Sequence, residues 1–251
     1  MHRFSMPQPA EVGGTVEIRG SDAHHIKDVL RLSAGDRIGL FDDRGTAFEA
    51  RLEAVTARVV RVKIIAAYPA AENESPVALT VAQAYLKDKK MDGLVRQLTE
   101  LGAARWIPFF SERSVPKPPP DRIEKRIERW RRISREAVKQ CRRRRSMVVE
   151  PALSFDTMLD CSRDDDLRVI FWEDHPQGID LDRNRTGKRP IRRIFLILGP
   201  EGGFSETEIR RAADCGCVTA GLGPRILRAE TAAVAALTLL QFLFGDMGRK
   251  P

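Results

Sequence analysis

The sequence has few of the residues on which metal sites, disulfide frameworks and nucleophilic catalysis depend. It contains four cysteines and four histidines among 251 residues. Cys215 and Cys217 lie two positions apart with no histidine near them, so the cysteines form no metal-binding pattern. No histidine pairs obviously with a serine or cysteine, which leaves a nucleophilic mechanism with little support. We therefore expect reduced thiols in a cytoplasmic protein without a metal site.

Long hydrophobic runs are also missing. The longest uncharged apolar stretch, residues 231–244, is shorter than the roughly 20 residues that a membrane span needs. The first ten residues lack the apolar run of a signal peptide. The hydrophobic fraction of 42% is nevertheless enough for a core, which excludes a disordered chain. We expect a soluble protein, without a membrane partner, made of one large domain or two ordinary ones.

The positive charge is concentrated in one segment. The chain has 43 basic and 35 acidic residues, a net charge of +8. Residues 121–145 alone contain 12 basic and 4 acidic residues, which is again a net charge of +8. Such a concentration favours a surface that binds nucleic acid over a diffuse basicity. The alternative is an ordinary solvated face of a helix.

The first seventy residues predict a small β-barrel. Runs with alternating or β-branched residues predict strands at 15–20, 36–42, 46–55 and 57–65, with one helical piece at 24–32. Several short strands at close spacing must close on themselves or expose their edges, which favours a barrel. The polar stretch 71–76 is a plausible linker.

From residue 77 onward, strands and helices alternate. Strands are predicted at 77–86, 105–110, 167–174, 193–199 and 218–223, and helices at 89–102, 121–141, 205–216 and 230–244. This alternation predicts a mostly parallel sheet covered by helices. We expect Asp121 to N-cap the second of these helices, with Glu124 completing the box, and Ser205 with Glu208 to form a capping box for the third.

Two short motifs are candidates for chemistry. GPEGGF, residues 199–204, follows a buried strand and precedes a capped helix, so its backbone N–H groups could approach a ligand closely. It lacks the ending of a P-loop and the Rossmann spacing, and a purely steric tight turn is the alternative. Arg228 and Glu230 stand at the start of an apolar helix. The helix dipole alone would stabilise Glu230 by roughly 0.3–1 kcal/mol, whereas Arg228, a bidentate donor, has no such explanation.

The two motifs together carry a family resemblance. LILGPEGGFSETEI and LGPRILRAETAAVAAL, in this order, resemble the signature of the ribosomal RNA small subunit methyltransferase E family, uridine-N3 methyltransferases of the SPOUT superfamily. HHIKDVLRLSAGDRIGLFDDRG resembles the family's N-terminal PUA-like barrel, and KKMDGLVRQLTELGAARWIPFFSERS and WRRISREAVKQCRRRR resemble its middle segments. The resemblance covers nearly the whole chain.

The resemblance implies a fold, a cofactor and partners. The fold would be α/β, with a PUA-like RNA-binding β-barrel at residues 1–72 and a SPOUT methyltransferase domain at residues 73–251. A deep trefoil knot, otherwise essentially absent from proteins, would lie in the C-terminal part. The cofactor would be S-adenosyl-L-methionine, bound in the knot. The partners would be 16S rRNA in the small ribosomal subunit and a second copy of the chain, a homodimer formed through the knotted domain.

The resemblance also implies residues for each role. Arg228 would stabilise the uracil imide anion, and Glu230 would act as a base or orient the substrate. The implied cofactor-binding residues are Trp172, Leu198, Gly199, Pro200, Glu201, Gly202, Leu222, Gly223, Arg225, Ile226, Leu227 and Thr231. The implied RNA-binding residues are Arg3, Arg31, Arg129, Arg132, Arg142, Arg143, Arg144 and Arg145. Two other functions stay open: ribose 2′-O methylation, and RNA binding by an assembly factor without catalysis.

Overall fold

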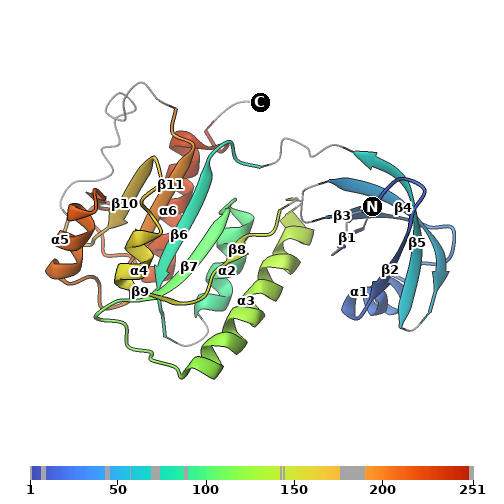
Figure 1. The fold of residues 1–251 in the computed structure, drawn as a ribbon, viewed down its shortest axis with the longest axis horizontal. Helices are drawn as coiled ribbons and strands as arrows, with labels where there is room; N and C mark the ends of the chain where they lie inside the picture. The colour runs from blue at the N-terminus through green and yellow to red at the C-terminus, as the bar shows by residue number, and fades with distance from the viewer. Residues whose placement is uncertain are drawn as a thin grey trace. The chain divides into compact units, whose positions relative to one another are not determined.

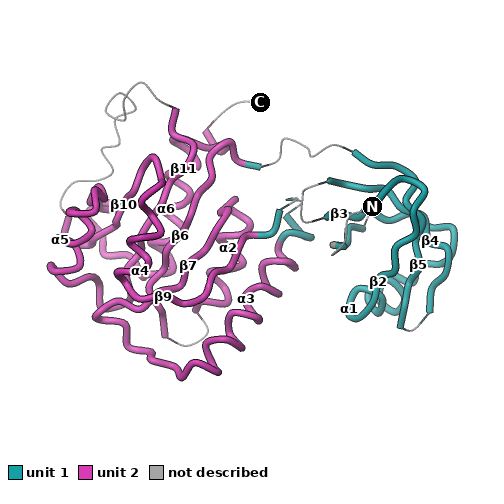
Figure 2. Tube along the Cα trace, viewed as in Figure 1, with its two compact units in different colours: residues 1–74, 138–146 teal, residues 75–137, 147–251 magenta. Residues whose placement is uncertain are grey.

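The computed structural model describes residues 2–6, 10–42, 46–56, 58–68, 74–87, 90–141, 143, 145–175 and 190–248. The chain divides into two compact units, coloured separately in Figure 2. Residues 1–74 and 138–146 form the first unit, and residues 75–137 and 147–251 form the second. The first unit therefore includes a short segment from the middle of the chain. The expected domain boundary between residues 72 and 73 stays a prediction.

The first unit contains a five-stranded sheet with the order β1-β3-β4-β5-β2. β1 runs parallel to β3, and the other neighbours are antiparallel. The strands are β1 (Arg3–Ser5), β2 (Thr15–Arg19), β3 (Arg37–Phe41), β4 (Ala47–Val55) and β5 (Val59–Tyr68). A helical segment made of α1 (Ser21–His24) and the π-helical turn η1 (His25–Val29) follows β2. The four predicted strands and the helical piece are confirmed, whereas closure of the sheet into a barrel stays a prediction.

The second unit is built on a parallel sheet. Its seven strands follow the order β12-β10-β11-β6-β7-β8, and β9 also pairs with β7. Every recorded pairing in it is parallel, as the alternation of strands and helices predicted. The strands are β6 (Ala78–Ala84), β7 (Arg105–Phe110), β8 (Val148–Val149), β9 (Leu153–Ser154), β10 (Leu167–Phe171), β11 (Arg193–Leu198) and β12 (Val218–Ala220).

Helices cover both faces of this sheet (Figure 1). One face packs against α2 (Lys90–Glu100), α3 (Pro120–Cys141) and α6 (Ala229–Phe244), and the other against α4 (Phe155–Asp160) and α5 (Glu206–Asp214). β11 shows the consequence clearly: Leu196 faces the first group of helices and Phe195 the second, and both are fully buried. A strand buried on both faces is what the apolar run at 193–199 predicted.

The capping box of α5 is confirmed. The Ser205 hydroxyl accepts a hydrogen bond from the backbone N–H of Glu208, and the Glu208 carboxylate accepts one from the N–H of Ser205. The other oxygen of this buried carboxylate accepts a hydrogen bond from the N–H of Glu112, at 2.9 Å. One side chain therefore caps α5 and also holds the loop after β7.

The predicted N-cap of α3 was wrong by two positions. Asp121 does not precede the helix, because the helix begins at Pro120. Proline suits the first helical position, since it has no N–H to leave unpaired there and its φ angle is already helical. Asp121 lies instead in the first turn, where its charge favours the helix dipole.

Candidate functional site

A cavity of about 350 Å³ lies where β10, β11 and β12 end. The loops after these three strands form most of its wall, and the first turn of α6 completes it. This volume is in the range of small-molecule sites, and ligands of open parallel sheets typically bind at the carboxyl ends of the strands. The location alone therefore indicates a ligand site.

Most of the residues predicted to bind a cofactor line this cavity. They are Trp172, Leu198, Gly199, Pro200, Glu201, Leu222, Gly223, Arg225, Ile226 and Leu227. Arg228, predicted to be catalytic, lines it as well. Gly202, Thr231 and Glu230 are not among the lining residues. The backbone carbonyl of Gly202 instead accepts a hydrogen bond from Arg113, at 3.1 Å. The ligand roles of all these residues stay predictions.

Six further residues, which were not among those named as cofactor-binding, complete the wall: Lys90, Phe171, Glu173, Gly203, Ala229 and Ala232. Five of them directly adjoin predicted positions, since Phe171 and Glu173 flank Trp172, and Gly203, Ala229 and Ala232 follow Gly202, Arg228 and Thr231. Lys90 is different because it lies on α2, more than 80 residues before the first of the three loops. No local motif marks it, so only the folded chain places it at this site.

A buried glutamine holds the start of the loop after β11 by a hydrogen bond. Gln83 is fully buried in β6, and its Nε2 donates a hydrogen bond to the carbonyl oxygen of Gly199, at 2.9 Å. Its Oε1 has no hydrogen-bond partner among the described residues. On the other side, the ring of Phe204 approaches to 3.2 Å of the position that a Cβ on Gly199 would take. The start of the loop is therefore tightly enclosed, and residue 199 has little room for a side chain.

Three charged side chains meet at the edge of the cavity. The Lys90 ammonium lies 3.0 Å from Glu201 Oε1 and 3.6 Å from Glu230 Oε2. Hydrogen bonding to Glu201 raises the pKa of Lys90, against the opposing effect of burial. Burial would raise the pKa of Glu201, but hydrogen bonds from Lys90 and from the backbone outweigh it and lower that pKa. Lys90 and Glu201 are therefore both charged at neutral pH.

Arg228 occupies the N-cap position of α6 with its side chain exposed. Its guanidinium caps nothing, and no ion pair is recorded for it among the described residues. Its backbone carbonyl accepts a hydrogen bond from Ala232, at 2.8 Å, as a helical N-cap should. The backbone of Arg228 therefore starts the helix, while its charged group stays available to a ligand.

Five of the predicted RNA-binding arginines have exposed or partly exposed side chains, and Arg145 is the fifth. Arg31 is exposed and has a positive φ of 54°. Arg3 is partly buried, with its guanidinium 5.3 Å from the centre of the Phe41 ring. On α3, Arg132 is exposed, and Arg129 is half exposed with an ion pair to Asp92 at 2.7 Å. These positions are compatible with phosphate contacts, which stay predictions.

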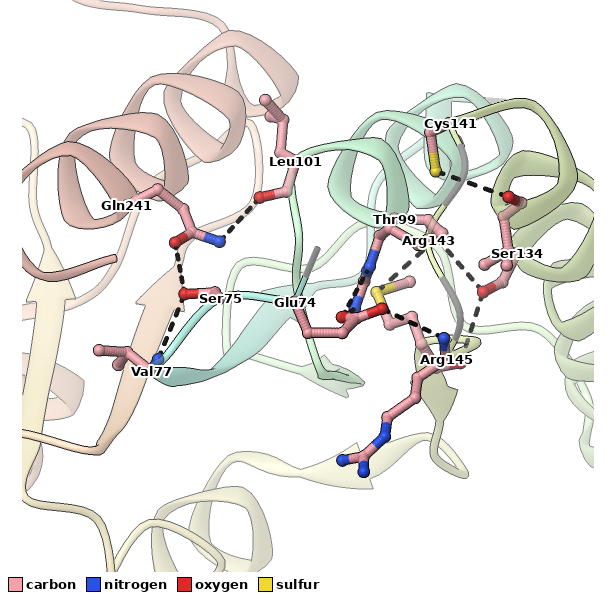
Figure 3. Close-up of polar contacts among 12 residues, drawn as sticks. Glu74, Ser75, Val77, Thr99, Leu101, Ser134, Cys141, Arg143, Arg145 and Gln241 are labelled. Carbon is pink, nitrogen blue, oxygen red and sulfur yellow. Dashed lines mark hydrogen bonds and ion pairs between the residues drawn. The ribbon is translucent and has the colours of Figure 1, made fainter. Parts of the chain in front are cut away.

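The basic run after α3 includes a buried arginine. Arg143 is buried, and its guanidinium binds the Glu74 carboxylate at 2.8 Å (Figure 3). The same carboxylate accepts a hydrogen bond from the backbone N–H of Arg145, whose side chain is exposed. Arg143 therefore has a structural partner in Glu74, and its contact with RNA stays a prediction. Arg142 and Arg144 lie outside the described residues.

Metal clusters and membrane-spanning helices are both absent from the described part of the chain. Within the described ranges, no group of three or more histidine, cysteine, aspartate or glutamate side chains could hold a metal ion. Within the same ranges, no helix has both the length and the apolar character required to cross a membrane.

Family models match both parts of the chain. A model described as "RNA methyltransferase domain" matches residues 73–241. A second, described as "RNA methyltransferase PUA domain", matches residues 18–65. The first match includes β10 to β12 and the loops that line the cavity. The second includes β3 and β4 and parts of β2 and β5.

Individual relatives match over nearly their full lengths. The ribosomal RNA small subunit methyltransferase E of Bacillus subtilis is 33% identical over 239 residues, which cover 94% of this chain and 93% of the relative. The structure of the Neisseria gonorrhoeae protein of the same name, bound to S-adenosyl methionine, has a TM-score of 0.88 at 31% identity, with 98% of this chain and 99% of that one covered. A putative methyltransferase from Legionella pneumophila with bound cofactor SAM also has a TM-score of 0.88, at 30% identity and with 98% of both chains covered.

Proposed function

Because the chain belongs to the ribosomal RNA small subunit methyltransferase E family, we propose that it transfers a methyl group from S-adenosylmethionine to N3 of one uridine in 16S rRNA. The observation that carries this proposal is the cavity at the carboxyl ends of β10, β11 and β12. Three loops that the family resemblance implied as cofactor loops form it together, although they are far apart in sequence.

The residues of the cavity fit S-adenosylmethionine. Leu198, Leu222 and Leu227 offer apolar surface for an adenine ring. Glu173 and Glu201 bring carboxylates to a ligand that carries positive charge. The indole Nε1 of Trp172 is buried without a hydrogen-bond partner among the described residues, so it has a donor to offer. When bound, the cofactor supplies an electrophilic methyl group.

The residues of this chain would then prepare the uracil for attack. N3 of uracil carries a proton, and base pairing would hide this atom. The target uridine must therefore be unpaired or flipped out of its helix. Arg228 would hold the uracil oxygens and stabilise the negative charge that develops as the N3 proton leaves. Glu230 would orient the base or accept that proton. Its Oε2 is buried and has no hydrogen-bond partner among the described residues, although Lys90 lies 3.6 Å away.

Charge on both units would hold the RNA. Arg129 and Arg132 on α3, Arg31 and Arg3 in the first unit, and the exposed side chain of Arg145 are the arginines that we propose for phosphate contacts. Such contacts would supply affinity and position, whereas the cavity would supply the chemistry. A ribosomal RNA substrate also agrees with the expected cytoplasmic location.

The methyltransferase reaction has a direct test. We expect the purified chain to bind S-adenosylmethionine in a calorimetric titration and to transfer a labelled methyl group from it to small ribosomal subunits. Naked 16S rRNA, tested in parallel, would show whether the assembled subunit is needed. Absence of cofactor binding would contradict the proposal, and it would favour a non-catalytic RNA-binding protein.

We also propose that the second unit contains the trefoil knot and forms the homodimer. α6 exposes apolar side chains, among them Phe242 and Leu239, which are 58% and 42% exposed. A second copy of the chain would bury this surface.

We expect light scattering to give twice the 28.2 kDa mass of the chain, and Phe242→Asp to give the single mass. Val29→Asp, an equally apolar and exposed site in the first unit, is the control and should stay dimeric. A monomeric wild-type chain would contradict the dimer.

A further inference from the structure

The side chain of one lysine contacts residues of two segments that are distant from it in sequence. Lys90 is the first residue of α2, Glu201 lies in the loop after β11, and Glu230 lies in the first turn of α6. The Lys90 ammonium is 3.0 Å from Glu201 Oε1 and 3.6 Å from Glu230 Oε2. All three side chains are only about a quarter to a third exposed. The contacts are therefore partly shielded from water. Ion pairs in such a setting are stronger than ion pairs at an open surface.

Both carboxylates depend on this ammonium, in different ways. Glu201 Oε1 also accepts a hydrogen bond from the backbone N–H of Lys87, at 3.1 Å, so it has two donors at the start of α2. Glu230 Oε2 is buried and has no hydrogen-bond partner among the described residues, which leaves Lys90 as its compensating charge. A buried carboxylate oxygen without a compensating group is costly. Without Lys90, the two carboxylates would also face each other as like charges.

The arrangement affects the residue that we place in the reaction. Glu230 is two positions after Arg228, the N-cap of α6, and Glu201 follows the part of the cavity wall formed by Gly199 and Pro200. An ammonium bound to both carboxylates therefore sets the distance between the start of α6 and the loop after β11. These are two of the walls between which a cofactor and a base would meet.

We propose that Lys90 is a positioning residue that clasps the start of α6 to the loop after β11 and thereby places Arg228 relative to the bound cofactor. This inference rests on the proposed methyltransferase function. Because Lys90 already binds two carboxylates, its charge serves the shape of the site and not the binding of an RNA phosphate. Lys87 offers the contrast, since its side chain is exposed on the same segment.

Three substitutions in the full-length protein test the clasp. Lys90→Met removes the charge and should weaken S-adenosylmethionine binding and lower kcat, each by about ten-fold, the effect of one lost charged hydrogen bond. Lys90→Arg keeps the charge and should restore both to within about three-fold of wild type. Lys87→Met removes an equal charge from the same segment and should leave cofactor affinity and kcat at wild-type values. If Lys87→Met is impaired as much as Lys90→Met, the charge serves RNA binding and the clasp is wrong.

A second readout needs no turnover. The ammonium lowers the pKa of Glu201, so this carboxylate adds stability above its unfolded pKa, and that stability is lost as pH falls through the folded pKa. In Lys90→Met the folded pKa rises, so less stability depends on this carboxylate, and the thermal unfolding temperature of the cofactor-free protein should fall less on acidification than in wild type. Lys90→Arg should keep the wild-type profile. Identical profiles for wild type and Lys90→Met would overturn the proposal.

A double substitution covers the case in which Lys90→Met folds poorly. Lys90→Met combined with Glu230→Gln removes the ammonium and also the buried negative charge. We expect the cofactor affinity and kcat of this double variant to be within about three-fold of those of Glu230→Gln alone, because the effects of substitutions at coupled residues are not additive. If the effects of the two single substitutions on affinity and kcat add up fully in the double variant, the proposed role of Lys90 is contradicted. A wild-type chain without any methyl transfer would instead refute the proposed function, and the unfolding profiles would still report on Lys90.

Discussion

Replacement of Arg228 by alanine should abolish turnover while leaving cofactor affinity nearly unchanged. The guanidinium is exposed, lines the cavity and caps nothing, so its loss removes no recorded structural contact among the described residues. Removal of one donor that stabilises a developing anion typically costs roughly 10²–10³-fold in kcat. Single-turnover transfer of a labelled methyl group measures the rate, and calorimetry with S-adenosylmethionine measures the affinity.

Arg225→Ala is the matched control for this prediction. It removes the same charge from the same loop, three residues earlier, and Arg225 is likewise exposed and lines the cavity. Since Arg225 was predicted to bind the cofactor, its loss should weaken affinity and leave kcat near wild type at saturating cofactor. Normal turnover in Arg228→Ala would remove Arg228 from the reaction. Equal loss of affinity in both variants would place Arg228 among the cofactor contacts only.

The second large effect is expected for Gly203→Ala, which should lower cofactor affinity at least ten-fold. Gly203 lines the cavity with φ at +67°, a conformation that costs other residues roughly 1–2 kcal/mol. A Cβ at this position would also overlap a carboxylate oxygen of Glu173 and push that side chain from its place in the wall. Calorimetry with S-adenosylmethionine and a thermal unfolding curve measure the two consequences.

Two other glycines separate the effect of backbone strain from the effect of displacing Glu173. Gly223 also lines the cavity with positive φ, at +91°, but nothing lies within 4 Å of its Cβ position, so Gly223→Ala adds strain without displacing a neighbour. Gly93 lies within α2, where alanine should stabilise the helix by roughly 0.5–1 kcal/mol and leave affinity unchanged. Gly203→Ala with the affinity of Gly223→Ala would show that the position of Glu173 is unimportant.

Local patterns predicted most of the regular structure. Alternation and apolar runs located β2 to β7, β10 and β11, because these strands have five or more residues and leave a periodic signal. The three-residue β12 was also located. β8 and β9 have two residues each and therefore no period to read. The capping box of α5 was legible because its two residues lie three apart. The start of α3 was misplaced because an acidic residue beside a proline fits two registers.

The site was harder to predict because its contacts are distant in sequence. The glycines at 199–204 were equally compatible with a ligand loop and with a steric turn, and only the family resemblance separated these alternatives. Lys90 carries no motif, and its partners Glu201 and Glu230 are 111 and 140 residues away. Arg143 belonged to a run of four arginines, where charge counts cannot reveal that Glu74 binds one of them in a buried position.

The central claim is that the chain methylates N3 of a uridine, and nucleoside mass spectrometry tests it most directly. Small ribosomal subunits would be incubated with the protein and S-adenosylmethionine, and their 16S rRNA digested to nucleosides. The account predicts that 3-methyluridine appears at one mapped position and that Arg228→Ala forms it at least about a hundred-fold more slowly. A methyl group found on the ribose 2′-oxygen, or no new methylated nucleoside at all, would contradict it.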